Sequence, residues 1–154
     1  MSLRPDQIRR YARHVLLPDV GGVGQKRLLT TSVRIDRAEG AGSVAILYLA
    51  AAGVGTLVVT DEAIVGQPDG FLYEVSDIGK RRLDAVNARV EAMNPDVQVV
   101  SEGAAELHLL LPVTSDPVEA LEVGSAAAGR LVLHVAAAAH GGPASLAGSG
   151  ARDA

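Results

Sequence analysis

The chain has 154 residues, of which 48% are apolar, 21% charged and 3% aromatic, and its formal net charge is −4. This length fits one domain with a core built from Ala, Val and Leu. The acidic balance excludes nucleic acid and anionic membrane surfaces as expected partners, because no basic stripe can neutralise phosphates. Cysteine is absent, which excludes thioester, persulfide and disulfide chemistry and zinc sites built on CxxC pairs.

The sequence predicts a cytoplasmic protein without a metal site. Residues 1–10 lack the apolar core of a signal peptide, and no uninterrupted apolar run reaches the roughly 18 residues of a membrane span. The four histidines are widely separated and lack metal-ligand spacing.

The N-terminal part, residues 4–30, is predicted to be helical. Residues 5–14 carry apolar side chains at helical spacing, with Pro5 at a tolerated first-turn position. Pro18 breaks this pattern, and Gly21 begins a second short helix.

Residues 33–62 have the layout of a nucleotide site. A strand at 33–35 is followed by a glycine turn with Gly40 and Gly42, a helix at 42–52 that stops at Gly53, and a strand at 57–60. Asp61 comes directly after this second strand.

The rest of the chain continues the alternation of strands and helices. Asp77 is a plausible N-cap for a long helix that ends at Asn94-Pro95, and Asp116 is the expected N-cap of a helix that stops at Gly129. The other predicted elements are, in chain order, strand 97–100, strand 107–111, helix 117–128 and strand 131–135.

This alternation predicts an α/β fold with a doubly wound, mostly parallel, Rossmann-like sheet and N-terminal helices. We expect residues 1–138 to form this domain. Residues 139–154 are rich in Gly, Ala and Ser and are predicted to be a flexible tail.

The glycine turn departs from the pattern that binds phosphate. A Rossmann turn needs glycine at three places, which fall here at Arg37, Glu39 and Gly42. A carboxylate at Glu39 would repel a phosphate ~4 Å away by about 4 kcal/mol at an effective dielectric constant near 20. We therefore expect Asp36 or Glu39 to occupy the anion site and to cap the helix.

Three segments in this order resemble the ThiF/MoeB-type adenylyltransferase family, relatives of the ubiquitin-activating enzymes. The segments are RRYARHVLLPDVGGVGQKRLLTTSV, LYLAAAGVGTLVVTDE and DIGKRRLDAVNARVEAMNPDVQV, within about residues 9–100. Members of this family bind ATP with magnesium and adenylate the C-terminal glycine of a ubiquitin-like carrier. The resemblance thus implies ATP and magnesium as cofactors if nucleotide binding is retained.

The resemblance also implies roles for single residues. Arg13 matches the arginine that reaches across the family's dimer to the partner's ATP, Arg82 falls on the phosphate-contacting lysine, and Asp61 matches the ribose-binding acid. Asp116 is the nearest candidate for the magnesium-binding aspartate. The family's second acidic residue falls on Ala63.

These residues also have structural explanations that require no ligand. Gly40 and Gly42 would serve a tight turn without ligand, and Asp61 could simply start a turn. Arg13 could be an interface salt-bridge partner, and Arg82 part of a solvated helix face.

Three functions follow from the sequence. The first is a degenerate, non-catalytic dimer partner or scaffold in a ubiquitin-like or sulfur-carrier system, as a homodimer or with an intact paralogue. The second is a reduced but active adenylyltransferase that activates a carrier protein with ATP. The third is a nucleotide-sensing binding module without catalysis.

Overall fold

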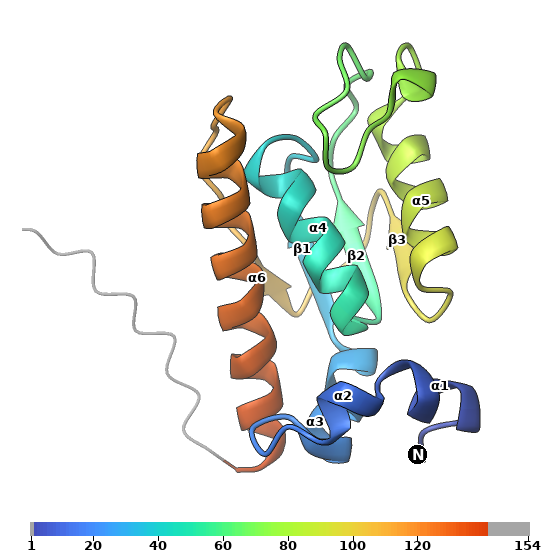
Figure 1. Ribbon diagram of the computed structural model, residues 1–154, viewed down its shortest axis with the longest axis vertical. Helices are drawn as coiled ribbons and strands as arrows, with labels where there is room; N and C mark the ends of the chain where they lie inside the picture. The colour runs from blue at the N-terminus through green and yellow to red at the C-terminus, as the bar shows by residue number, and fades with distance from the viewer. Residues whose placement is uncertain (1, 142–154) are drawn as a thin grey trace, which may run out of the picture.

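The computed structural model describes residues 2–141, which form a parallel four-stranded sheet packed against helices (Figure 1). The strand order is β3-β2-β1-β4, and every pairing between neighbours is parallel. This architecture confirms the predicted α/β, Rossmann-like class. The strands are β1 (Ser32–Ile35), β2 (Thr56–Val59), β3 (Gln98–Val100) and β4 (Leu107–His108).

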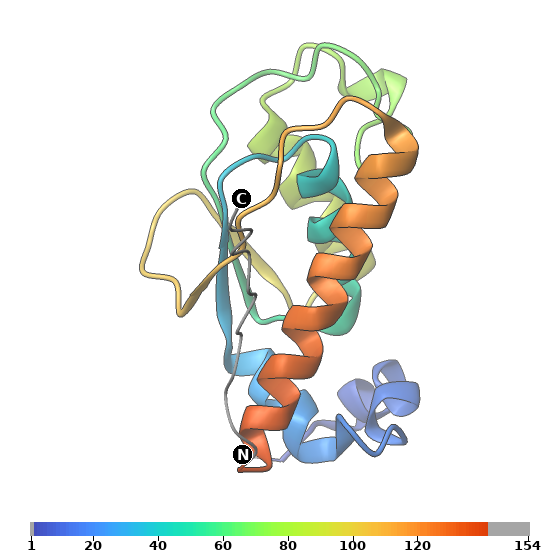
Figure 2. The same cartoon turned by 90° about the vertical axis from the view of Figure 1, so that its left-hand side faces the viewer.

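Three longer helices lie along one face of the sheet (Figure 2). They are α4 (Ala41–Ala52), α5 (Arg82–Met93) and α6 (Pro117–Ala139). The shorter helices α1 (Pro5–Arg10), α2 (Ala12–Val15) and α3 (Gly21–Thr30) lie at the amino ends of the strands, and η1 (Val75–Asp77) is one 3₁₀ turn. The carboxyl ends of the strands, the glycine turn and the start of α6 therefore meet at the opposite end of the molecule.

The core lies between the sheet and α4. Val33, Ile35, Leu57 and Val59 point from β1 and β2 into it, because alternate residues of a strand share a face. Helix α4 is buried on nearly all sides, since α6 covers the side that the sheet does not. Small residues bring the two helices close together: a Cβ at Gly124 would lie 2.5 Å from the carbonyl oxygen of Ala41.

The N-terminal helices dock through Tyr11. The helix predicted over residues 5–14 divides into α1 and α2 at this residue. The buried Tyr11 ring packs over Gly53, the left-handed residue that ends α4 as predicted, and its hydroxyl exchanges hydrogen bonds with the Asn94 side chain. Asp96 binds the same hydroxyl and forms an ion pair of 2.6 Å with Arg4. This network holds the N-terminal helices α1 and α2 against the C-terminal ends of α4 and α5.

The predicted fifth strand at 131–135 is wrong, because α6 runs unbroken through it. The buried residues of α6 follow helical spacing, so Leu131 and Val135 continue its buried face, while Leu133 is exposed. Gly129, the predicted end of the helix, is exposed on the solvent side of α6. No packing contact is lost there for want of a side chain, so α6 continues past it. Asp116 caps α6 as predicted, accepting from the N–H groups of Val118 and Glu119.

Two further elements differ from their predicted bounds. Asp77 is not the N-cap of α5: it ends η1, accepts from the Glu74 N–H and pairs with Lys80, while α5 begins after Arg81. The strand predicted at 107–111 is reduced to β4, although Leu109 still donates its N–H to the Arg34 carbonyl.

The crossover from β3 to β4 takes only residues 101–106, whereas parallel strands usually need a dozen or more residues for it. The short strands make this possible. β3 ends at Val100, which pairs with Val58, and Val58 in turn pairs with Arg34, so the chain already lies near the level at which β4 begins. The connection crosses the sheet almost sideways, and Arg34 binds the Gly103 carbonyl within it.

Helix α6 is long and apolar enough to cross a membrane by length and composition alone. One such helix, of whose most apolar window 39% is buried inside the fold, is weak evidence for a span. Of the predicted tail at 139–154, Ala139 ends α6 and residues 142–154 lie outside the described residues.

We expect Gly42→Ala to destabilise the fold by more than about 2 kcal/mol, because overpacking against backbone is not relieved by rotamer changes. A Cβ at Gly42 would lie 1.9 Å from the Arg37 carbonyl oxygen. Urea unfolding followed by circular dichroism measures the loss.

Gly129→Ala is the matched control, since a Cβ there meets nothing within 4 Å. As a helix-interior change it should stabilise the fold by about 0.5–1 kcal/mol. Equal effects of the two substitutions would contradict the close approach at Gly42.

Candidate functional site

The turn between β1 and α4 is set by two glycines. Gly40 has φ +53°, which favours glycine, and a Cβ there would lie 2.4 Å from the carbonyl oxygen of Thr114. Gly42 lets the first turn of α4 approach the Arg37 carbonyl. Backbone packing alone thus requires both glycines, as the tight-turn explanation expected; their contact with phosphate stays a prediction.

No acidic side chain caps α4, so the capping expected of Asp36 or Glu39 is wrong. The N-cap of α4 is Gly40, without a side-chain hydrogen bond. Asp36 turns toward the sheet edge, where it contacts His108 Nε2 at 2.7 Å and accepts from the Thr60 hydroxyl. Glu39 points to Arg82 instead. Nearby cations and hydrogen-bond donors outcompete the helix terminus for both carboxylates.

Asp61 is buried at the carboxyl end of β2, with 8% of its surface exposed. It accepts hydrogen bonds from the N–H groups of Ala38, at 2.9 Å, and Ala63, at 3.0 Å. Arg82 Nη1 lies 3.1 Å from its Oδ2. Burial raises the pKa of the Asp61 carboxyl, but these donors lower it by more, so its net pKa lies below the ordinary value.

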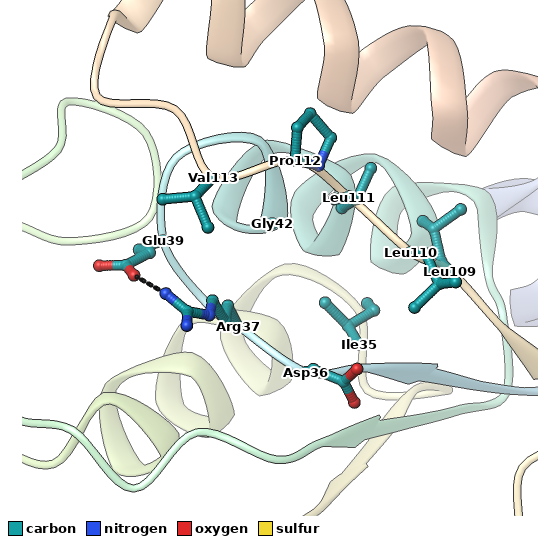
Figure 3. Close-up of a pocket in the computed structure, with 10 residues that line it drawn as sticks. All are labelled: Ile35, Asp36, Arg37, Glu39, Gly42, Leu109, Leu110, Leu111, Pro112 and Val113. Atoms are coloured by element: carbon teal, nitrogen blue, oxygen red, sulfur yellow. Dashed lines mark ion pairs between the residues drawn. The ribbon is translucent and has the colours of Figure 1, made fainter.

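Arg82, the first residue of α5, joins three elements through its guanidinium group. Nη1 contacts Asp61, while Nη2 lies 2.7 Å from Glu39 Oε2. Burial lowers the pKa of Arg82, and its bonds to the two carboxylates raise it by more. Glu39 also pairs with Arg37 at 3.5 Å (Figure 3). The structure therefore places Arg82 in an ion-pair network, which contradicts a merely solvated helix face.

A cleft of about 610 Å³ opens above this network, between the glycine turn, the connection after β2 and the start of α6. Its volume lies within the range of ligand pockets. Its charged lining consists of the carboxylates of Glu39, Asp69 and Asp116 and the guanidinium of Arg82. The three acids outnumber the single cation, so the cleft is electronegative.

A smaller cavity of about 130 Å³ lies between the carboxyl ends of β1 and β4, where the strand order reverses (Figure 3). This is the position at which open α/β sheets bind ligands. It is lined by Asp36, Arg37 and Glu39 on one side and by residues 109–113 on the other. Its volume is below the range of typical ligand pockets.

The predicted site residues are brought together in part. The large cleft is lined by Gly40, Arg82 and Asp116. Asp61 does not line this cleft but contacts Arg82. Arg13 is exposed on α2, at the end of the sheet remote from the cleft (Figure 1). Among residues 2–141, no group of three or more His, Cys, Asp or Glu could hold a metal ion.

Two contributors to the site escaped sequence analysis. The Tyr73 hydroxyl donates to the Ala38 carbonyl beneath the turn, and Asp69 Oδ1 accepts from three successive N–H groups, those of Phe71, Leu72 and Tyr73. Burial raises the pKa of Tyr73, which keeps its hydroxyl protonated as a donor. The Asp69-Gly70 turn signal could have indicated the second arrangement, but no local signal links residue 73 to residue 38.

Comparisons with known proteins agree on one family. A family model described as ThiF family matches residues 11–106. The SAMP-activating enzyme E1 of Haloferax volcanii is 40% identical over 102 residues, which are 64% of this chain and 38% of that protein. The sulfur carrier protein ThiS adenylyltransferase of Escherichia coli is 38% identical over 95 residues, which are 60% of this chain and 38% of that protein.

Solved structures show the same fold. PaaA has a TM-score of 0.59 at 31% identity and is matched over 68% of this chain and 36% of its own. The E. coli tRNA N6-threonylcarbamoyladenosine dehydratase TcdA, in complex with AMP, has a TM-score of 0.55 at 18% identity, over 66% of this chain and 43% of its own. The chain thus spans less than half the length of these relatives.

We expect Asp61→Asn to destabilise the protein at pH 7 by about 1–3 kcal/mol, since Arg82 and two N–H groups lose a buried charged acceptor. Because the folded-state pKa of Asp61 is lowered, its stabilisation is full above the unfolded carboxyl pKa of about 3.9 and is lost as pH falls toward the folded value. The difference from the wild type should therefore shrink below about pH 4 in urea unfolding.

Glu62→Gln is the control, because this neighbouring carboxylate is exposed. It should leave the acid limb of the stability profile nearly unchanged. An Asp61→Asn variant whose acid limb parallels that of the wild type would show that the Asp61 contacts do not stabilise its charge.

Proposed function

The chain belongs to the ThiF family, and we propose that it is a non-catalytic member in which its own ion pairs occupy the groups of the cleft that would bind phosphate. Its role is that of a dimer partner or scaffold in a system with a ubiquitin-like or sulfur-carrier protein. The names of its relatives, a SAMP-activating enzyme and an adenylyltransferase of a sulfur carrier protein, support this class of partner. The observation that carries the proposal is the contact of Arg82 with Glu39 and Asp61 at once.

The charge at the turn argues against a triphosphate. Phosphates need cations and N–H donors, and the one cation that lines the large cleft, Arg82, already holds two carboxylates. A phosphate that recruited Arg82 would leave the Glu39 carboxylate beside its own negative charge. Arg37 offers only partial compensation, since it pairs with the same carboxylate.

The hydrogen bonds of Asp61 argue against strong ribose binding. An ionised carboxylate has about four lone-pair sites. In Asp61 the N–H groups of Ala38 and Ala63 and the guanidinium of Arg82 use three of them. The remaining site could accept from one ribose hydroxyl, not from both. Asp61 therefore acts in the proposal as a structural acceptor that fixes the turn.

A second candidate is a reduced but active adenylyltransferase, which keeps ATP and magnesium as cofactors. It is favoured by the open cleft, in which Gly40, Arg82 and Asp116 converge. Asp116 caps α6 with Oδ1, which leaves its Oδ2 available for a cation. Pyrophosphate exchange that depends on a carrier protein ending in Gly-Gly would establish this activity and overturn the non-catalytic proposal. The nucleotide-sensing role and the cytoplasmic location stay predictions.

We expect isothermal titration of the wild type with MgATP to show no micromolar binding. Glu39→Gln removes one repulsive charge and releases Arg82 from that partner, so the affinity should rise by about tenfold to a thousandfold. The double variant Arg37→Gly with Glu39→Gly also removes the two side chains that stand where a Rossmann turn has glycine and phosphate has space. It should bind MgATP at least as tightly as Glu39→Gln.

Glu102→Gln is the matched control, because this exposed carboxylate lies in the crossover between β3 and β4, away from the cleft. It should leave the titration unchanged. Micromolar binding of MgATP by the wild type would contradict the proposal that ion pairs occupy the phosphate-binding groups. An equal rise in MgATP affinity for Glu39→Gln and Glu102→Gln would show that only the net charge matters.

A further inference from the structure

The backbone of Ala38, in the middle of the glycine turn, is held by side chains from three elements. Ala38 is fully buried, and its N–H donates to Asp61 at the end of β2 at 2.9 Å. Its carbonyl accepts from the hydroxyl of Ser43, in the first turn of α4, at 3.1 Å and from the hydroxyl of Tyr73, in the connection between β2 and α5. A carbonyl oxygen has two lone pairs, so both acceptor sites are in use. The backbone at this residue therefore cannot rotate unless these bonds break.

These bonds decide where the N–H group of Ala38 points. In a turn that binds phosphate, the N–H groups point at the ligand. Here the N–H of Ala38 points at Asp61, which contacts Arg82, and Arg82 in turn contacts Glu39. The hydroxyl of Tyr73 thus supports, through Ala38, the contacts that keep Arg82 with its two carboxylates.

Residues 66–78, which we call the connection loop, are fastened at the base and through two side chains. Two backbone hydrogen bonds of 2.9 Å close the base of the loop, between Val65 and residues 79–80. Leu72 and Tyr73 are the two buried residues of the loop, and both pack into the core. Leu72 is wholly apolar, whereas Tyr73 carries a hydroxyl that reaches the turn. Tyr73 therefore links the connection loop to the glycine turn.

The connection loop is also one wall of the large cleft. Gln67, Asp69 and Phe71 line this cleft together with Tyr73. A molecule that enters the cleft therefore contacts the same segment that holds Ala38. Movement of this wall away from the turn withdraws the Tyr73 hydroxyl from the Ala38 carbonyl, so the position of the wall and the shape of the turn are coupled.

We propose that Tyr73 is a latch that holds the glycine turn in its observed shape, and that displacement of the connection loop by a partner in the large cleft releases the turn. In the latched state the turn keeps Glu39 on Arg82. In the released state Glu39 is no longer held there, and the guanidinium of Arg82 becomes available to an anionic group. The inference rests on the proposed function, in which ion pairs withhold Arg82 from phosphate, and adds the means by which this site is regulated.

The test is Tyr73→Phe in the full chain without nucleotide. Phe keeps the packing of a side chain that is 4% exposed and removes only the hydroxyl. The measurement is the pKa of the Asp61 carboxyl, followed by carbon-13 NMR, since a role of Tyr73 in packing alone would not move it. Burial raises this pKa and the Ala38 N–H lowers it, so a released turn should shift it upward, toward the ordinary carboxyl value. The control is Tyr48→Phe on α4, which is 50% exposed and should leave the pKa unchanged.

Amide hydrogen exchange gives a second measurement. Loss of one hydrogen bond should raise the exchange rate of the Ala38 N–H by about tenfold in Tyr73→Phe, and Tyr48→Phe should leave this rate unchanged. An unshifted pKa of Asp61 or an unchanged Ala38 exchange rate in Tyr73→Phe would overturn the latch. A wild type whose Tyr73 ring shows no nuclear Overhauser contact with Ala38 would overturn it without any variant.

These outcomes are separate from those that test the proposed function. The titration of the wild type with MgATP decides whether the ion pairs withhold Arg82 from phosphate. The latch is judged without nucleotide, on Asp61 and Ala38 alone, so either idea can fail while the measurement for the other succeeds.

Discussion

The structure at the carboxyl ends of the strands depends on one guanidinium group. Arg82 contacts Asp61 at the end of β2 and Glu39 in the turn before α4, while its own backbone begins α5. Because Asp61 also accepts from Ala38, the same cluster fixes the path of the turn. A buried carboxylate with one cation and two N–H donors is well satisfied, whereas removal of one partner would leave an uncompensated charge. The ion pair therefore holds the shape of the turn, and the same contacts occupy the two side chains, Asp61 and Arg82, to which the family resemblance assigns nucleotide contacts.

The short strands set the rest of the architecture. β3 and β4 are so brief that residues 101–106 suffice to connect them across β2 and β1. Within residues 2–141 the sheet has four strands, with β4 at one border. The crevice where the strand order reverses lies between β1 and β4, and residues 109–113 line one side of it. The segment that follows β4 thus forms one wall of the small cavity.

Most elements near the glycine turn could be predicted from the sequence, because their signals are local. Gly53 ends α4 in a left-handed conformation, and Asp116 caps α6. The predicted fifth strand is wrong because residues 131–135, which read LVLHV, form a short and mostly apolar run, and such a run is typical of both buried strands and buried helices. Only the packing of α6 against α4 decided between them, since it requires burial at helical spacing. The prediction of Asp77 as the N-cap of α5 is wrong because the Glu74 N–H and the Lys80 ammonium bind its carboxylate within a separate turn.

The sequence by itself determined the α/β class, the family resemblance and the loss of two of the three glycines at the turn, because residue order and spacing carry these features. It also indicated Asp61 and Arg82 as candidate site residues, which the structure brings into contact. Only the tertiary structure decided where the charges go: Asp36 pairs with His108, and Glu39 binds Arg82 instead of capping α4. The physical reason is that a carboxylate selects the strongest donors within reach, and those donors come from residues tens of positions away in the chain.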